Sequence, residues 1–125
     1  MTTERQNQPS DGSGTVRSDA LRGHLDALIL AVLEDGPRHG YAVAEELRRR
    51  SHDALDLPTG TLYPALRRLE RLGWLDGSWE TVNGRRRRVY RLTRSGAAEL
   101  ASGRHEWEAF SGVISAVLSQ RPTSA

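Results

Sequence analysis

The dipeptide Asn83-Gly84 limits what this chain can fold into more than any other feature of its sequence. Asn-Gly is favoured by two-residue type I′ turns, which join neighbouring antiparallel strands. The runs on its two sides, WLDGSWETV and RRRRVYRLT, contain the β-branched and aromatic residues that strands prefer. Because a two-residue loop also fixes which residues lie opposite each other, the sequence predicts a β-hairpin with one register.

This register gives the two faces of the hairpin different chemistry. It places Val82 opposite Arg85, and it sets Trp79 opposite Arg88, whose guanidinium can lie over the indole. One face pairs opposite charges, Glu80 with Arg87 and Asp76 with Arg91. The other face, which includes Arg88, carries the apolar residues Leu75, Trp79, Tyr90 and Leu92. We therefore expect the second face to pack on a core.

Helical periodicity replaces the strand pattern on both sides of the hairpin. The predicted helices cover residues 20–34, 40–50, 59–73 and roughly 94–119. Gly73 is the expected C′ residue of the third helix, and Thr93 is the expected N-cap of the last one. The predicted core face of the third helix consists of Leu62, Ala65, Leu66, Leu69 and Leu72. Three helices, a hairpin and a further helix predict a mainly α fold with a β-hairpin, arranged as a winged helix-turn-helix.

The positive charge of the chain is concentrated in about one quarter of its length. Residues 61–94 carry nine arginines against three acids, whereas the whole chain has a net charge of only +2. Four arginines follow the predicted turn directly, namely Arg85, Arg86, Arg87 and Arg88. Successive side chains of a strand point to opposite faces, so the hairpin tip presents cations on two sides. This pattern favours contact with nucleic acid, although a basic turn also protects an edge strand from aggregation.

The third predicted helix has an open face suited to reading DNA. Thr61, Tyr63 and Pro64 lie near its N-terminus, where a helix-turn-helix protein reaches base edges and where the helix dipole favours phosphate. Pro64 lacks an amide hydrogen, which matters little near a helix start, so we place that start at Thr59–Gly60. Three arginines follow on this face, Arg67, Arg68 and Arg71. Two alternatives remain open: Tyr63 packs against the hairpin, or the arginines pair with Glu70 or face solvent.

The last predicted helix carries an apolar stripe with heptad spacing. The stripe consists of Leu100, Trp107, Phe110, Ile114 and Val117. A helix of about 26 residues is ~39 Å long, which is longer than a three-helix body can cover. An uncovered stripe of that length would be a large exposed apolar patch. We therefore expect a homodimer in which the stripe meets itself or the partner's first helix, including Leu25 and Leu28.

No pattern in the sequence indicates catalysis or a metal site. The chain has no cysteine, and its four histidines lie in different segments, outside any recognised catalytic or phosphate-binding motif. We therefore expect no enzyme activity, no catalytic residue, no metal and no cofactor. No apolar run approaches the about 18–20 residues that a membrane span needs, so we expect no membrane association. The polar N-terminus lacks the apolar region of a signal peptide, and a cytoplasmic protein is expected.

Three stretches of the chain resemble the PadR family of bacterial transcription regulators. They are HGYAVAEEL, GTLYPALRRLERLGWL and SWE…NGRRRRVYRLTRSG. The resemblance covers about residues 21–119 and implies a dimeric winged-helix protein that usually represses transcription. It implies DNA contacts by Thr61, Tyr63, Pro64 and the four wing arginines, and it adds Tyr41 as a phosphate contact or a support for the reading helix. Because one helix follows the hairpin, the chain is similar to the short type of the family.

The resemblance also implies a ligand, since some family members bind aromatic or multidrug effectors between these helices. Trp107 is therefore a candidate effector contact, or else a tryptophan of the dimer core. The expected function is a sequence-specific regulator of double-stranded DNA, acting as a homodimeric repressor on an inverted-repeat operator and released by a small-molecule effector. The alternative is a winged-helix module whose basic wing binds protein or RNA.

The expected organisation has four parts. Residues 1–18 have almost no apolar side chains, so they cannot bury enough surface to offset the entropy of ordering. The parts are a disordered tail at 1–18, a winged-helix DNA-binding domain at 19–93, a dimerisation helix at 94–120 and a tail at 121–125.

Overall fold

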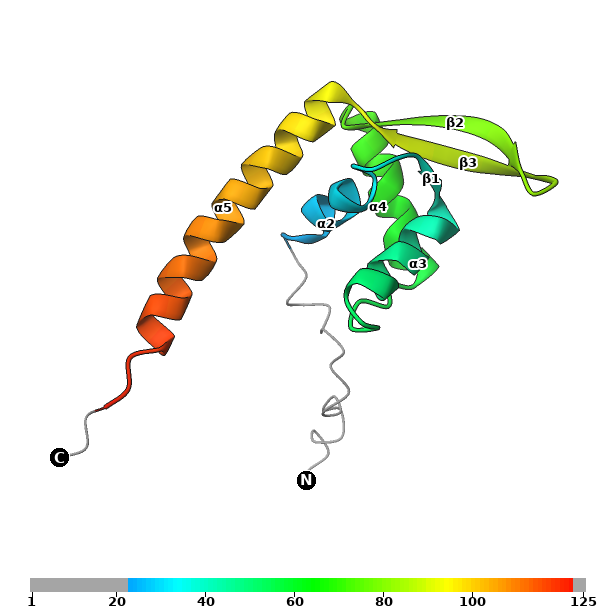
Figure 1. The fold of residues 1–125 in the computed structure, drawn as a ribbon. Helices are drawn as coiled ribbons and strands as arrows, with labels where there is room; N and C mark the ends of the chain where they lie inside the picture. The colour runs from blue at the N-terminus through cyan, green and yellow to red at the C-terminus, as the bar shows by residue number, and fades with distance from the viewer. Residues whose placement is uncertain (1–22, 123–125) are drawn as a thin grey trace.

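The computed structural model describes residues 23–122. The predicted disordered tail, the start of the helix expected from residue 20 and the last three residues lie outside this range. The elements are α2 (Leu25–Val32), β1 (Arg38–His39), α3 (Gly40–Arg50), α4 (Thr59–Arg71), β2 (Leu75–Val82), β3 (Arg85–Leu92) and α5 (Arg94–Leu118) (Figure 1). Three short helices form the body, a hairpin projects from it, and α5 leads away from both. The fold is therefore a winged helix-turn-helix with a long C-terminal helix, as predicted.

One apolar core joins the three short helices to the sheet. Its fully buried side chains include Ile29, Leu30, Val43, Leu62, Leu66, Leu69 and Leu75. In α4 the predicted face is confirmed at Leu62, Ala65, Leu66 and Leu69, which are all buried. The prediction for Leu72 is wrong, because this side chain is 52 % exposed. Leu72 follows the last residue of α4 as its C-cap, where the chain turns away from the core.

Local capping sets the ends of the helices at the predicted places. Gly73 has a φ of +83°, the left-handed conformation expected of a C′ residue. The Thr93 hydroxyl oxygen accepts a hydrogen bond of 3.0 Å from the Gly96 amide and so caps α5. The same hydroxyl donates to the Gly73 carbonyl at 2.7 Å. The end of α4 and the start of α5 are therefore tied together beneath the sheet.

The hairpin has the predicted register. All eight cross-strand pairs agree, from Val82 opposite Arg85 at the tip to Leu75 opposite Leu92 at the base. Asn83 and Gly84 both have positive φ angles, 51° and 79°, as a type I′ turn requires. The turn chemistry alone was therefore sufficient to align the two strands.

A third strand joins the sheet, and the sequence analysis did not predict it. The two-residue strand β1 pairs antiparallel with β3, with Arg38 opposite Tyr90 and His39 opposite Val89. The strand order is β1-β3-β2, so β3 is central. Two residues are too few to show a strand period. Their consequence is large, because β1 leads directly into α3 and so ties the start of that helix to the wing.

Two expectations about the hairpin faces are wrong. Leu75 and Tyr90 are buried, but Trp79 is 56 % exposed, because the outer half of the hairpin extends beyond the helical body (Figure 1). The ion pairs also differ, since Glu80 binds Arg91 at 2.7 Å rather than Arg87 directly opposite. Arg91 lies opposite Asp76, on the same face as Glu80, and its long side chain reaches past Ser78, to whose hydroxyl it also donates at 3.1 Å.

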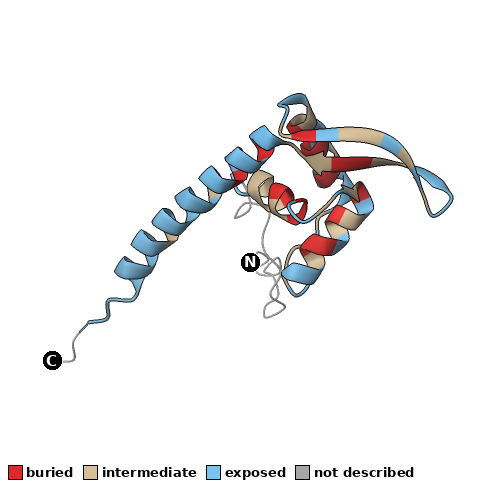
Figure 2. Cartoon of the chain, turned by 45° about the horizontal axis from the view of Figure 1, so that its top comes forward, coloured by how far each residue is buried: buried red, intermediate tan, exposed pale blue. Residues whose placement is uncertain are grey.

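Helix α5 is divided into a packed beginning and an exposed remainder (Figure 2). Leu100 is 2 % exposed and belongs to the chain's own core. Its assignment to a partner-facing stripe is therefore corrected. The apolar side chains further along are open: Trp107, Phe110, Val113, Ile114, Val117 and Leu118 are 41–76 % exposed. Leu25 and Leu28 of α2 are partly buried against the core beside α5.

Candidate nucleic-acid interface

Helices α3 and α4 form the helix-turn-helix, and α4 presents one open stripe. Its exposed residues are Thr59, Gly60, Thr61, Pro64, Arg67 and Arg71. The spacing of these residues follows the helical repeat, opposite the leucines that anchor α4 in the core. The helix begins at Thr59 as predicted. Pro64 is its sixth residue, however, so the proline lies in the second turn and removes the amide that would otherwise bond the Gly60 carbonyl.

Tyr63 lies on the flank of this stripe, against the start of α3. A Cβ atom at Gly40 would lie 2.3 Å from Tyr63 Cε1, so only glycine at position 40 allows this approach. Tyr63 is half-buried and packs at the edge of the core. The close packing against α3 therefore restricts the position of the Tyr63 side chain.

A groove of about 640 Å³ connects α3, α4 and the wing. Its lining includes six residues predicted to contact DNA: Tyr41, Tyr63, Arg67, Arg86, Arg87 and Arg88. Five further residues line the groove and were not predicted to contact DNA, namely His39, Gly40, Glu70, Trp79 and Tyr90. The groove thus brings together segments that lie about 50 residues apart in the chain, and its charged lining is predominantly basic.

The predicted arginines differ in how freely they can meet an anion. Among the described residues, no carboxylate lies within ion-pair distance of Arg67, Arg71, Arg85, Arg86 or Arg87. Arg68 is different, because it forms a two-point ion pair with Asp26 of α2 at 2.7 and 2.9 Å. That hydrogen bond raises the pKa of Arg68 further. The Arg68 side chain therefore binds α4 to α2, and its contact with DNA stays a prediction.

His39 occupies the first position before α3 and caps that helix. Its Nδ1 accepts a hydrogen bond of 3.3 Å from the Ala42 amide. The neutral imidazole consequently carries its hydrogen on Nε2, which is available as a donor at the groove. Burial lowers the pKa of His39, and the nearby Arg87 charge lowers it further. Histidine is not a frequent N-cap residue, so its identity alone carries little signal for this role.

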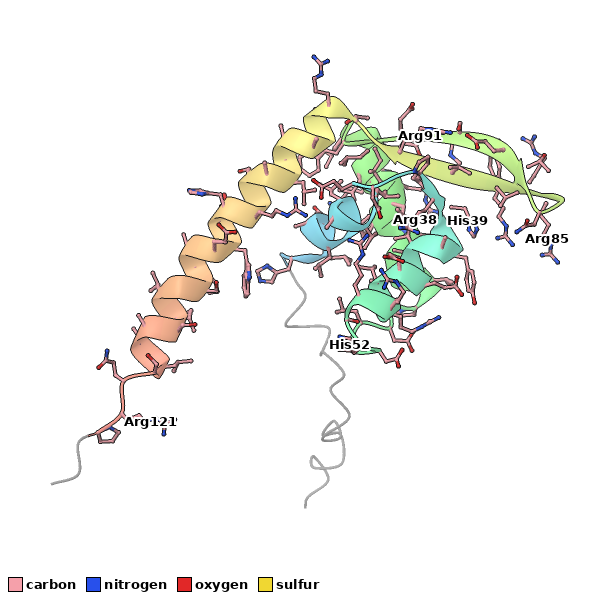
Figure 3. The ribbon with its side chains drawn as sticks, in the orientation of Figure 1. Arg38, His39, His52, Arg85, Arg91 and Arg121 are labelled. Carbon is pink, nitrogen blue, oxygen red and sulfur yellow. The ribbon has the colours of Figure 1, made fainter. Side chains whose placement is uncertain are left out.

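Tyr41 is an exposed aromatic residue of the groove, in the first turn of α3. It is 52 % exposed, and its ring lies parallel to that of His39, with 6.5 Å between ring centroids. Figure 3 shows His39 between α3 and the wing that carries Arg85.

A second groove of about 860 Å³ lies between α2 and α5. Its walls include His24 and Leu28 on one side and Trp107 and Phe110 on the other. The rings of Trp107 and His24 meet edge to face, with 5.4 Å between their centroids. The rings of Trp107 and Phe110 are tilted to each other, with 6.0 Å between their centroids. This groove contains the tryptophan that the sequence analysis named as an effector candidate.

The part of the chain that the structure describes contains neither a metal-binding cluster nor a membrane-spanning helix. Residues 23–122 contain no cluster of three or more side chains able to hold a metal ion. None of the described helices combines the length and apolar character needed to cross a bilayer.

Comparison with known proteins agrees with the fold. Residues 29–102, more than half of the chain, match the family model of the transcriptional regulator PadR-like family. "Uncharacterized protein X" of Lysinibacillus sphaericus is 34 % identical over 100 residues, covering 79 % of this chain and 92 % of that protein. "Transcriptional regulator Rv3488" of Mycobacterium tuberculosis is 41 % identical over 80 residues, covering 64 % of this chain and 72 % of that protein.

A solved structure gives the same result. The structure of a transcriptional regulator from Clostridium thermocellum superposes with a TM-score of 0.72 at 32 % identity, covering 78 % of this chain and 95 % of that one. The chain belongs to the PadR-like family of transcriptional regulators, which are winged-helix DNA-binding proteins and not enzymes.

Proposed function

We propose that this protein is a cytoplasmic, homodimeric repressor that binds an inverted-repeat operator in double-stranded DNA. The observation that supports this most is the basic groove where Arg67 of the open stripe of α4 meets the wing arginines Arg86 and Arg87. In a helix-turn-helix the N-terminal part of the second helix enters the major groove. Here that end of α4 has no side-chain cap, because its N-cap residue is Pro58. Its first amides are therefore suited to a phosphate or a base edge.

The residues of this surface divide by chemistry into readers and phosphate contacts. Thr61 and Pro64 are exposed near the start of α4, where they can meet base edges and the thymine methyl group. Tyr63 flanks them with its phenol fixed against Gly40. Arg67 and Arg71 stand further along α4 and are suited to the backbone. On the wing, Arg85, Arg86 and Arg87 follow the turn, and Tyr41 lies across the groove from them.

The dimer would form through the exposed half of α5. Its open apolar side chains form one stripe over residues 107–118. A twofold axis through this stripe would bring two copies of the same surface together and place two α4 helices on one face. Inverted-repeat operators match proteins with this symmetry. Leu100 is excluded from the proposed interface, and Trp107, Phe110, Ile114 and Val117 remain in it, with Leu25 and Leu28 at its edge.

A salt titration of DNA binding tests the proposal. Log K for a duplex operator should fall linearly with log salt, with a slope of about −0.9 per phosphate neutralised. Arg85→Ala with Arg86→Ala should reduce the magnitude of that slope by about 1.8, because two phosphate contacts are lost. Arg121→Ala is the control, because it removes one arginine charge at the far end of the molecule and should leave the slope unchanged (Figure 3). Binding that favours RNA, or that ignores salt, would replace the proposal with the interaction-module alternative.

The groove between α2 and α5 favours a second element of function, release by an aromatic effector. Trp107 and Phe110 supply aromatic faces, and in the dimer this groove would border the partner. A planar aromatic probe such as anilinonaphthalene sulfonate should quench Trp107 fluorescence and weaken operator binding. Trp107→Leu should abolish the quenching, whereas Trp79→Leu on the wing should leave it in place. An equal effect of both changes would place the probe elsewhere.

A further inference from the structure

Three elements of the DNA-binding surface meet at Gly77, near the base of the wing. Arg88 of β3 crosses the face of β2 and forms an ion pair with Glu70 of α4. The pair is partly buried, with side chains 32 % and 27 % exposed. The Arg88 guanidinium carbon also lies 5.6 Å from the centre of the Trp79 ring. A single arginine thus connects the recognition helix to both strands of the wing.

Gly77 makes room for this connection. A Cβ atom at position 77 would lie 2.9 Å from both carboxylate oxygens of Glu70 and 3.0 Å from Arg88 Nε. Both distances are tighter than ordinary van der Waals contact. The backbone at Gly77 does not have a positive φ. A methyl group at this position would therefore have to displace the ends of the Glu70 and Arg88 side chains, whereas the backbone conformation itself does not call for glycine.

The ion pair changes what Arg88 can do. Its charge is neutralised by Glu70, whereas Arg85, Arg86 and Arg87 have no carboxylate partner among the described residues. Glu70 is the one carboxylate that lines the groove. Without Arg88, this carboxylate would face the phosphates of bound DNA and repel them.

Trp79 has a part in the same arrangement. Its indole is 56 % exposed, which the core prediction did not explain. Arg86 lies over the ring with its guanidinium carbon 5.4 Å from the centroid, close to the 5.6 Å of Arg88. The exposed indole therefore supports two arginines by cation–π contact. Glu70 holds Arg88, and Arg88 contacts the Trp79 ring. The positions of this ring and of Arg86 above it therefore depend on the position of α4.

We propose that Glu70 and Arg88 are a positioning pair that sets the angle between the wing and the recognition helix α4, and that neither of them contacts DNA. Gly77 provides the space for the pair, and Trp79 transmits its position to Arg86. This inference rests on the proposed DNA-binding role of the groove. It gives Arg88 a positioning role in place of the DNA contact expected from the sequence.

A double-mutant cycle with Glu70→Ala, Arg88→Ala and the double variant tests the proposal on duplex operator DNA. Each single change should weaken DNA binding by about 3- to 30-fold. The double variant should bind DNA at least as tightly as the single variant of lower affinity, because both changes break the same ion pair. Glu70→Ala distinguishes a positioning role of Glu70 from mere repulsion of DNA phosphates by its carboxylate. If Glu70 only repelled phosphate, its removal would tighten binding, and that result would overturn the proposal.

The salt slope gives an independent check. Arg88→Ala should leave the slope unchanged, whereas Arg85→Ala should lower its magnitude by about 0.9, the value for one lost phosphate. A drop of the same size for Arg88→Ala would show that Arg88 itself contacts DNA. Gly77→Ala changes no charge, and it should weaken operator binding at constant slope. Unchanged binding by Gly77→Ala would also overturn the proposal.

A measurement without DNA separates this inference from the proposed function. Amide hydrogen exchange over residues 78–89 should speed up in Glu70→Ala and in Arg88→Ala, while exchange in α2 stays as in the wild type. Unchanged exchange in the wing would refute the positioning pair even if the protein binds DNA. Faster exchange in a protein that binds no duplex would support the pair and refute only the DNA-binding role of the groove.

Discussion

Phe110→Ala is the sharpest test of the proposed dimer. Phe110 is 54 % exposed on the part of α5 that has left the body of its own chain. Its nearest aromatic neighbour is Trp107, with ring centroids 6.0 Å apart. Removing the Phe110 ring should therefore lower the stability of the single chain only slightly. Any large effect on the protein must come from a partner subunit that covers the ring.

The expected magnitude follows from the area that remains to be buried. Full burial of a phenylalanine side chain is worth about 1.5–3 kcal/mol, so the exposed half accounts for about 1–1.5 kcal/mol. A twofold interface contains two copies of Phe110, which gives about 2–3 kcal/mol for the dimer. The dimer Kd should accordingly rise by about 30- to 150-fold.

Sedimentation equilibrium over a range of protein concentrations measures this Kd directly. His105→Ala is the matched control, because His105 is exposed on the same helix but points away from the apolar stripe. The control should leave the Kd as in the wild type. Equal Kd values for Phe110→Ala and His105→Ala would refute the interface, and a persistent dimer in Trp107→Glu with Phe110→Glu would refute it independently.

Three further predictions concern the single chain. Leu100→Ala should lower the free energy of unfolding by about 2–5 kcal/mol in urea melts, because a buried leucine leaves a cavity, and a loss below 1 kcal/mol would contradict its place in the core. Gly40→Ala should displace Tyr63 and reduce the ratio of operator to random DNA binding, measured by fluorescence anisotropy, and an unchanged ratio would contradict a reading role for Tyr63. Hydrogen bonds from Arg49 and Arg50 hold the pKa of Glu46 at about 2 against an ordinary 4.5. The stability this carboxylate contributes is thus present above pH 4.5 and lost as pH falls toward 2, so melting temperatures of Glu46→Gln should fall less than those of wild type over that range.

Local signals predicted most of the secondary structure. The Asn83-Gly84 turn aligned all eight cross-strand pairs, and Thr93 and Gly73 marked helix ends that the structure confirms. Each of these signals depends on residues within a few positions of one another, because turns and caps are satisfied by neighbouring backbone groups. The start of α4 at Thr59 was predicted in the same way.

The composition of the groove was only partly predictable. Tyr63, Arg67 and three wing arginines were predicted as contacts, but His39 and Glu70 were not. His39 enters the groove through the two-residue strand β1, whose pairing with β3 has no sequence period. Glu70 enters because Arg88 reaches back to it across Gly77. Neither relationship is visible from the identity of the residues alone.

The sequence by itself determined the elements and their register, because turn and cap chemistry and apolar periodicity act over short distances. The tertiary structure decided which side chains those elements leave free. It paired Arg68 with Asp26 across 42 residues of sequence and Arg88 with Glu70 across 18. It also divided one apolar stripe of α5 into a buried Leu100 and an exposed remainder, because the body of the chain covers only the first turns of that helix. Ion pairing and burial depend on which elements lie next to each other in the folded chain. The apolar repeat of α5 does not show this, because it continues unchanged beyond the part that the body covers.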